Sequence, residues 1–178
     1  MYKDRDGGVW VGTFFGGVNY LPERVPRFRK WYYTDDSNGL DAMRVKEICP
    51  DGKGCLWIGT EDAGLYHFDP SSGEFRFFEP SRDFSNIHGI MMDGDELWVS
   101  TFSKGIQVID TRTWKVVRQY DTNHPQDRRL FSNYVFALEK TSMGRIYIGT
   151  MHGLQYYNDD EDNFGYVPQI NGGKMVND

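Results

Sequence analysis

The chain has 178 residues, a formal net charge of −6 and a pI near 5.2, and 16% of its residues are aromatic. An acidic chain without clustered Lys and Arg lacks the surface that nucleic acids need, so we expect no nucleic-acid partner. No stretch is apolar over the length that crosses a bilayer, so we expect no membrane-spanning segment.

A motif of five β-branched, aromatic and small residues occurs four times, at residues 9–13, 56–60, 97–101 and 146–150. Gly-rich turns bound each copy, which is typical of a strand. The aromatic residue of the motif recurs at intervals of 41 to 49 residues, as Trp10, Trp57, Trp98 and Tyr147. Such a period indicates a repeat architecture, and we predict that these four in-phase aromatic residues lie in the core between stacked sheets.

Each repeat contains three further short strands. An apolar strand leads into the motif across a turn such as Asp51-Gly52. A third strand begins after a Gly, as at Gly64-Leu65, and a fourth begins ten residues further on, as at Phe75. The sequence therefore predicts an all-β fold of about four four-stranded antiparallel sheets. The first sheet is expected to be incomplete, because residues 1–3 are too few for its first strand.

We expect one domain over residues 1–178. Its repeats fall at residues 1–33, 43–79, 85–120 and 133–168, and residues 169–178 resemble the start of another repeat. The chain begins and stops within a repeat, so we expect it to be a segment of a longer array.

Two cysteines, Cys49 and Cys55, flank the turn of the second repeat, and we predict that they are cross-strand neighbours. They are either two core thiols or a disulfide. The chain does not show four ligands at zinc spacing, and its four His are scattered. We therefore expect no metal, no cofactor and no catalytic residue.

The second repeat gives the clearest resemblance to a known family. Four-stranded repeats of this length resemble the blades of a β-propeller. The run from Val45 through Asp51, Gly54 and residues 56–60 to Gly64 is similar to the two-component regulator propeller repeat. The resemblance covers nearly the whole chain, and its departures include Ser100 for the motif Gly and Thr141 for the turn Asp.

This resemblance implies a β-propeller arc of about four blades, the first incomplete. It also implies the periplasmic sensor region of a hybrid two-component sensor histidine kinase of Bacteroidetes, which senses glycan fragments and signals through a phosphorelay. We expect this segment to be a non-catalytic part of such a receptor. The alternatives are a propeller enzyme such as a lyase, and a scaffold propeller that binds protein. The expected partners are an oligosaccharide, and either further blades of the parent chain or a second copy of this one.

Aromatic and polar residues outside the repeat phase are the candidate ligand-binding residues. They lie in connections that share one face of a propeller, where rings can stack on sugar C–H faces and polar groups can bond hydroxyls. Ordinary partial burial of these rings is the alternative. The candidates are Phe14, Phe15, Trp31, Tyr33, Glu61, Asp62, Phe102, Lys104 and His152.

Overall fold

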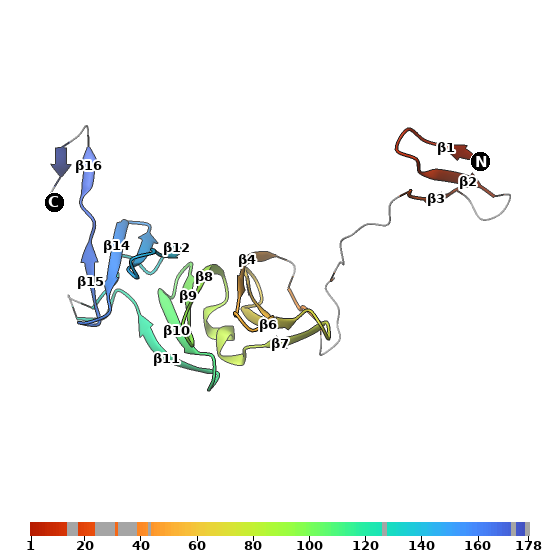
Figure 1. Ribbon diagram of the computed structural model, residues 1–178. Coiled ribbons are helices and arrows are strands. Elements are labelled where there is room, and N and C mark those ends of the chain that lie inside the picture. The colour runs from red at the N-terminus through yellow and green to blue at the C-terminus, as the bar shows by residue number, and fades with distance from the viewer. Residues whose placement is uncertain are drawn as a thin grey trace. The chain divides into compact units, whose positions relative to one another are not determined.

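Figure 1 shows a computed structural model of the chain, which is all-β apart from one short 3-10 helix among the residues it describes. The described residues are 1–13, 18–23, 31, 39–42, 44–125, 128–171 and 174–176. The chain divides into two compact units, Met1–Tyr32 and Tyr33–Asp178. In the described part of the chain, no helix has the length and apolar character needed to cross a membrane.

The first unit is a three-stranded antiparallel sheet of β1 (Tyr2–Lys3), β2 (Val9–Gly12) and β3 (Val18–Leu21). Tyr2 pairs with Trp10, so the prediction that this repeat lacks its first strand is wrong. Two residues are enough because the Asp4 carboxylate closes the following turn, accepting the Gly8 N–H at 2.8 Å. The predicted fourth strand of this repeat lies outside the described residues.

The second unit contains three four-stranded antiparallel sheets, each with its strands in chain order. The second blade consists of β4 (Val45–Pro50), β5 (Leu56–Thr60), β6 (Leu65–Asp69) and β7 (Glu74–Phe77). The third consists of β8 (Ile87–Asp93), β9 (Glu96–Thr101), β10 (Ile106–Asp110) and β11 (Lys115–Tyr120). The fourth consists of β12 (Val135–Lys140), β13 (Ile146–Thr150), β14 (Gly153–Asn158) and β15 (Asn163–Tyr166). A hairpin of β16 (Gln169–Asn171) and β17 (Lys174–Val176) follows.

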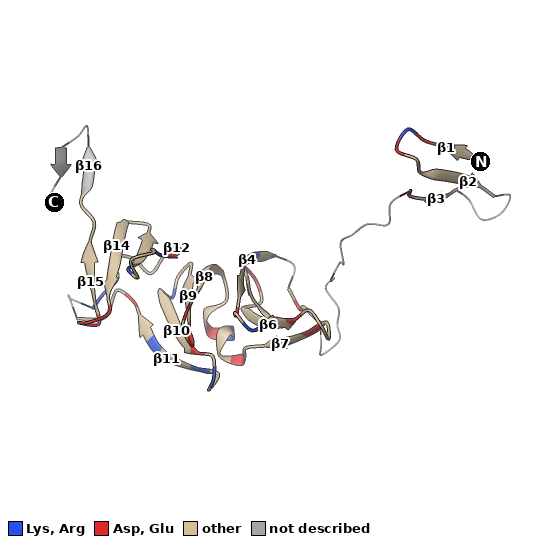
Figure 2. Cartoon of the chain, viewed as in Figure 1, with Lys and Arg blue, Asp and Glu red and all other residues tan. Residues whose placement is uncertain are grey.

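These sheets are the predicted propeller blades. Strands β4, β8 and β12 of successive blades lie beside one another, which makes them the innermost strands (Figure 1). Charged residues mark mainly the turns and strand ends, while most of the strand ribbon carries other residues (Figure 2). The 3-10 helix η1 (Glu79–Phe84), which the sequence did not reveal, connects the second blade to the third.

The blades pack through the motif strands. Trp57 is 1% exposed in a cluster that includes Ile87 of the next blade, and Trp98 is 1% exposed in a cluster with Ile148. The other two in-phase aromatic residues differ from the expectation. Trp10 is 41% exposed and packs on Tyr20, with ring centroids 4.4 Å apart. Tyr147 is only partly buried, and its ring centroid lies 6.4 Å from that of Tyr156 in the same blade.

The motif glycine sets how closely two blades approach. A Cβ atom at Gly59 would lie 2.6 Å from Cγ2 of Ile87 in the next blade, closer than carbon atoms can pack. In the third blade Ser100 replaces this glycine and pairs across the strands with Gly89. A Cβ atom at Gly89 would lie 2.8 Å from the Ser100 hydroxyl. The larger residue is therefore accommodated by a smaller one on the neighbouring strand.

Candidate functional site

Three repeat positions bring side chains together at one end of the blades. They are the residue just before the innermost strand, the second residue of that strand, and the residue after the motif Thr. These positions hold Arg44, Lys46 and Glu61 in the second blade, Asn86, His88 and Phe102 in the third, and Tyr134, Phe136 and Met151 in the fourth. We call these nine residues the rim surface.

Backbone hydrogen bonds fix the rim surface in the same way in each blade, joining the residue after the motif to the residue before the innermost strand. The bonds are Glu61 N–H to Arg44 C=O (2.9 Å), Phe102 N–H to Asn86 C=O (3.0 Å) and Met151 N–H to Tyr134 C=O (3.0 Å). In addition, the Asn86 N–H donates to the Glu61 C=O at 3.1 Å, which ties the third blade to the second. The main chain under the rim surface is thus held within and between blades.

The centre of the rim surface is a group of aromatic rings from the third and fourth blades. The Phe102 ring centroid lies 4.9 Å from that of Tyr134, 5.4 Å from His88 and 6.1 Å from Phe136. Phe102, Tyr134 and Phe136 remain 38%, 38% and 41% exposed. Burial lowers the pKa of His88, and nearby Lys46 adds to this effect. A neutral, partly exposed aromatic platform results.

The second blade gives this platform a charged border. The Glu61 carboxylate lies 3.7 Å from both the Arg44 and the Lys46 side-chain nitrogens. These charged groups are exposed or half-buried, so their ion pairs contribute little free energy. A polar ligand can therefore replace one partner of a pair at a small cost in free energy. An apolar face bordered by hydrogen-bonding groups is typical of a small-molecule binding site.

The structure brings some of the predicted residues to this surface and not others. Glu61 and Phe102 belong to the rim surface, and Asp62, Lys104 and His152 lie in the same connections between second and third strands. The His152 Nδ1 atom is 3.3 Å from the Phe131 carbonyl oxygen. Trp31 is described in the other unit. Phe14, Phe15 and Tyr33 lie outside the described residues.

Sequence reasoning missed His88, Tyr134 and Phe136. A usable signal was present, because Lys46, His88 and Phe136 each follow the first apolar residue of an innermost strand. His88 and Phe136 alternate with Ile87 and Val135, which are buried, so their side chains had to point elsewhere.

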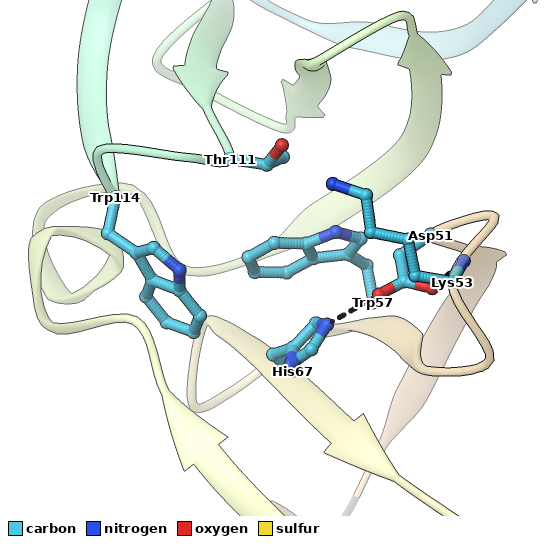
Figure 3. A pocket seen from close by; sticks show the side chains of 6 residues that line it. All are labelled: Asp51, Lys53, Trp57, His67, Thr111 and Trp114. Atoms are coloured by element: carbon cyan, nitrogen blue, oxygen red, sulfur yellow. Dashed lines mark hydrogen bonds and ion pairs between the residues drawn. The ribbon is translucent and has the colours of Figure 1, made fainter.

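A second candidate place is a cavity of about 150 Å³ at the opposite end of the blades, where the first and second strands of each blade are joined (Figure 3). The second and third blades both line it, through Asp51, Lys53, Trp57, His67, Thr111 and Trp114. We call it the turn-side cavity. Trp114 adopts a φ of 56°, which is strained for a bulky residue. Its ring centroid lies 5.3 Å from Trp57 and 5.7 Å from His67.

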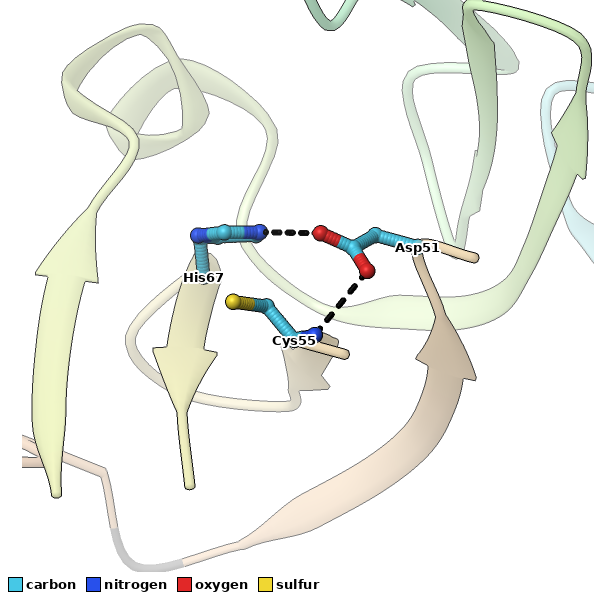
Figure 4. A group of neighbouring side chains, drawn as sticks. All are labelled: Asp51, Cys55 and His67. Carbon is cyan, nitrogen blue, oxygen red and sulfur yellow. Dashed lines mark hydrogen bonds and ion pairs between the residues drawn. The ribbon is translucent and has the colours of Figure 1, made fainter. Parts of the chain in front are cut away.

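Asp51 organises one wall of the turn-side cavity (Figure 4). Its Oδ1 accepts the Lys53 N–H at 2.7 Å and the Cys55 N–H at 3.0 Å, which closes the turn from β4 to β5. Its Oδ2 lies 3.0 Å from Nε2 of His67 on β6. Burial alone would raise the pKa of Asp51, but the Lys53 N–H and His67 outweigh it and lower this pKa.

The two cysteines are not paired with each other. Cys49 lies opposite Trp57 in the ladder, and Cys55 faces Asp51 across the turn, so the prediction that they are cross-strand neighbours is wrong. Both thiols are free. Burial raises the pKa of the Cys55 thiol, and the charges of Asp51 and Asp69 raise it further.

Solved structures share this fold. One is the extracellular domain of BT4673 from B. thetaiotaomicron, a protein described once as a one component system and once as a hybrid two component system. The first structure has a TM-score of 0.66 and 20% identity, and covers 93% of this chain and 21% of that one. The second has a TM-score of 0.67 and 19% identity, and covers 97% of this chain and 22% of that one.

A third structure is the extracellular domain of BT3049, a hybrid two component system from the same organism. Its TM-score is 0.50 at 24% identity, and the alignment covers 99% of this chain and 28% of that one. The chain thus spans between a fifth and a third of the length of these structures. At these identities the likeness establishes the fold.

Among curated proteins, no sequence matches this chain. The family model described as two component regulator propeller matches residues 39–62, which contain β4, β5 and the turn between them. Residues 39–62 are therefore similar to the two-component regulator propeller repeat, and the described sheets of the chain fold as the blades of a β-propeller.

Proposed function

We propose that this chain is a non-catalytic segment of the sensor region of a two-component signalling receptor, and that its rim surface binds an oligosaccharide. The observation that carries the proposal is the group of half-exposed rings formed by Phe102, Tyr134 and Phe136 with His88. The structural likeness to extracellular domains of two-component systems supports a sensor role. It also supports a location in the periplasm, with kinase and regulator domains elsewhere in the parent chain.

The chemistry of the rim surface suits a sugar. One face of a pyranose ring presents C–H groups that pack on an aromatic ring, and its edges present hydroxyls that need hydrogen-bond partners. The rings of the third and fourth blades offer a surface on which the C–H face can pack. The side chains of Glu61, Arg44 and Lys46 offer hydrogen-bond partners for the hydroxyls. Because backbone hydrogen bonds hold the rim connections in place, little conformational entropy is lost when a ligand binds.

The histidine on this surface contributes its ring to the aromatic platform. His88 Nε2 lies 3.0 Å from the side-chain oxygen of Asn86, and the His88 ring stacks on Phe102. Since burial lowers the His88 pKa, the ring is neutral at neutral pH and acts as part of the platform.

Calorimetric titration with a panel of plant and host oligosaccharides tests the proposal. The double variant Phe102→Ala and Phe136→Ala should weaken binding of any ligand at least about tenfold, since it removes two stacking faces. Met143→Ala is the matched control, because Met143 is an exposed apolar residue in the turn at the other end of the fourth blade. Binding that survives in the double variant would place the site elsewhere, and Trp31→Ala would then test the first unit.

A further inference from the structure

Three different metal-binding side chains meet beside the turn-side cavity. Asp51, Cys55 and His67 each offer one ligand atom, and these atoms all lie within 4.8 Å of one another. Figure 4 shows the Cys55 sulfur and the Asp51 carboxylate on the side of the turn that faces the His67 ring. The three side chains come from the turn between β4 and β5 and from the adjacent strand β6.

The other repeats of the chain show which part of this arrangement the fold requires. Asp4 in the first sheet occupies the position of Asp51, and its Oδ1 also accepts two N–H groups of the turn, from Asp6 and Gly8. The Asp side chain therefore has a structural role in closing the turn, which Oδ1 alone fulfils. Its second oxygen is available for another partner.

That second oxygen has different partners in the two sheets. In the first sheet, Asp4 Oδ2 accepts the Trp10 indole N–H at 2.9 Å. In the second blade, Asp51 Oδ2 contacts His67 instead, and no hydrogen-bond acceptor in the described residues reaches the Trp57 indole N–H. The Trp98 indole N–H is likewise unpaired, so this feature alone does not indicate a ligand.

The Cys and the His are specific to the second blade. Cys55 lies two residues before the motif aromatic residue Trp57. The same position holds Gly8 in the first sheet and Arg145 in the fourth blade. The cross-strand partner of the motif aromatic residue is His67 in the second blade. The corresponding partners in the other copies are Tyr20, Val108 and Tyr156. The fold is therefore built without either side chain, and the second blade combines a thiol, an imidazole and a carboxylate oxygen that the turn itself does not use.

From this juxtaposition we propose that Asp51, Cys55 and His67 form a site for a zinc-class divalent cation. One sulfur, one imidazole nitrogen and one carboxylate oxygen are the donors that zinc prefers, whereas calcium and magnesium require mainly oxygen ligands. Three protein ligands leave one position of a tetrahedral ion for water or another donor. Binding releases the thiol proton to solvent. The proton that His67 Nε2 donates to Asp51 Oδ2 moves to Nδ1, so that Nε2 can bind the ion, and the ion then lies between the carboxylate and the ring.

The surroundings provide what such a site needs. His67 and Asp51 also line the turn-side cavity, so the fourth position has room for a water molecule. The His67 ring packs against two indole rings. Its centroid lies 4.7 Å from that of Trp57 and 5.7 Å from that of Trp114 in the third blade. The sequence predicted no metal because it shows no four ligands at the spacing of a zinc site, and these three residues become neighbours only when β6 pairs with β5.

Cobalt(II), which occupies zinc sites and absorbs light, tests this proposal on the full chain with its thiols kept reduced. We expect one equivalent to bind with a thiolate-to-cobalt charge-transfer band, and one equivalent of zinc to displace it. Cys55→Ser should remove the band and weaken zinc binding at least about tenfold. His67→Tyr, which installs the residue of the first sheet, should weaken binding similarly.

Cys49→Ser is the matched control, because Cys49 is the other free thiol in the same hairpin and faces Trp57. It should leave the band and the affinity unchanged. Circular dichroism and melting in the presence of a chelator establish that each variant is folded. The proposal is overturned if the wild-type chain gives no thiolate band, if Cys49→Ser loses it, or if Cys55→Ser and His67→Tyr bind zinc like the wild type.

Discussion

A single carboxylate in the fourth blade shows how charge, backbone conformation and stability are linked. Asp162 accepts hydrogen bonds from the hydroxyls of Tyr120 and Tyr157, at 2.5 and 2.9 Å, and lies 3.3 Å from Arg128. Burial alone would raise the pKa of Asp162, but the two tyrosines and Arg128 outweigh it and lower this pKa. Because the pKa is lower in the folded state, the stabilisation is present above the unfolded-state pKa and is lost as the pH falls through the folded-state value.

We predict that Asp162→Asn lowers the free energy of unfolding by about 1 kcal/mol at neutral pH, a small value because the carboxylate is partly exposed. Asn tolerates the left-handed conformation of this residue, whose φ is 49°, so the change isolates the charge. Urea unfolding between neutral pH and about pH 3 measures the effect. A difference between variant and wild type that stays constant over this range would contradict the assignment.

Aromatic residues in and out of the repeat phase should differ in what they contribute to stability. We predict that Trp57→Ala destabilises the chain by about 3–5 kcal/mol, because it leaves a cavity between two blades. Phe102→Ala should cost far less, since the ring is 38% exposed and belongs to the rim surface. Thermal melts of the two variants compare them directly, and equal losses would show that the division into core and surface rings is wrong.

At the scale of the strands, glycine controls the contact between blades. We predict that Gly59→Ala destabilises the chain by about 1–3 kcal/mol, because the new methyl group overlaps Ile87 and Ile90 of the next blade. Gly149→Ala is the matched control. It changes the same motif position in the fourth blade, where the nearest atom to a new Cβ would be the Ala137 Cβ at 3.5 Å. Similar chemical denaturation midpoints for the two variants would contradict a close approach at Gly59.

The strands could be predicted because each has both a pattern and a boundary. The motif strand β5, for example, follows an Asp-Gly turn and ends before Gly64, so turn residues in the sequence predict both of its ends. The strand β1 was missed because two residues carry no pattern. The helix η1 was missed because its six residues, about two turns of a 3-10 helix, show no apolar periodicity. In η1, Ser81 is buried and its hydroxyl oxygen accepts the Leu65 N–H at 2.8 Å, a contact that only the folded chain reveals.

The candidate sites were predicted less well than the strands. Phe102 and Glu61 were proposed because they lie in connections, where function was expected, and the structure places both on the rim surface. His88 and Phe136 were missed because they lie on strands that were treated as core. The approach of His67 to Asp51 depends on the register between β5 and β6, which sequence spacing alone did not supply.

At the scale of the second unit, described by itself, one repeat position is buried in two blades and exposed in the other. Ile87 and Val135 are fully buried against the preceding blade. Val45, at the same position in the second blade, is 45% exposed, and Ile48 on the same strand is 58% exposed. Apolar side chains on a sheet face of this kind usually contact another sheet. We propose that further blades of a parent chain, or a second copy of this one, cover them.

We therefore predict that the purified chain associates at micromolar concentration, which sedimentation velocity measures. Ile48→Glu should reduce the association, because it places a charge among the exposed apolar side chains of β4. Met143→Glu should leave it unchanged, since Met143 lies at an exposed turn. A compact monomer at all concentrations, with a cooperative melt, would contradict the prediction and favour a self-contained propeller.

The pairing of Ser100 with Gly89 also limits which strands could be moved between repeats. Ser100 fits because Gly89, on the strand that pairs with it, has no side chain. The second and fourth blades instead place Glu47 and Ala137 opposite the motif glycine. A strand moved alone from one repeat to another would place Ser opposite a side chain, or Gly opposite Gly. A hairpin of the first two strands, moved as one piece, would keep both members of the pair together.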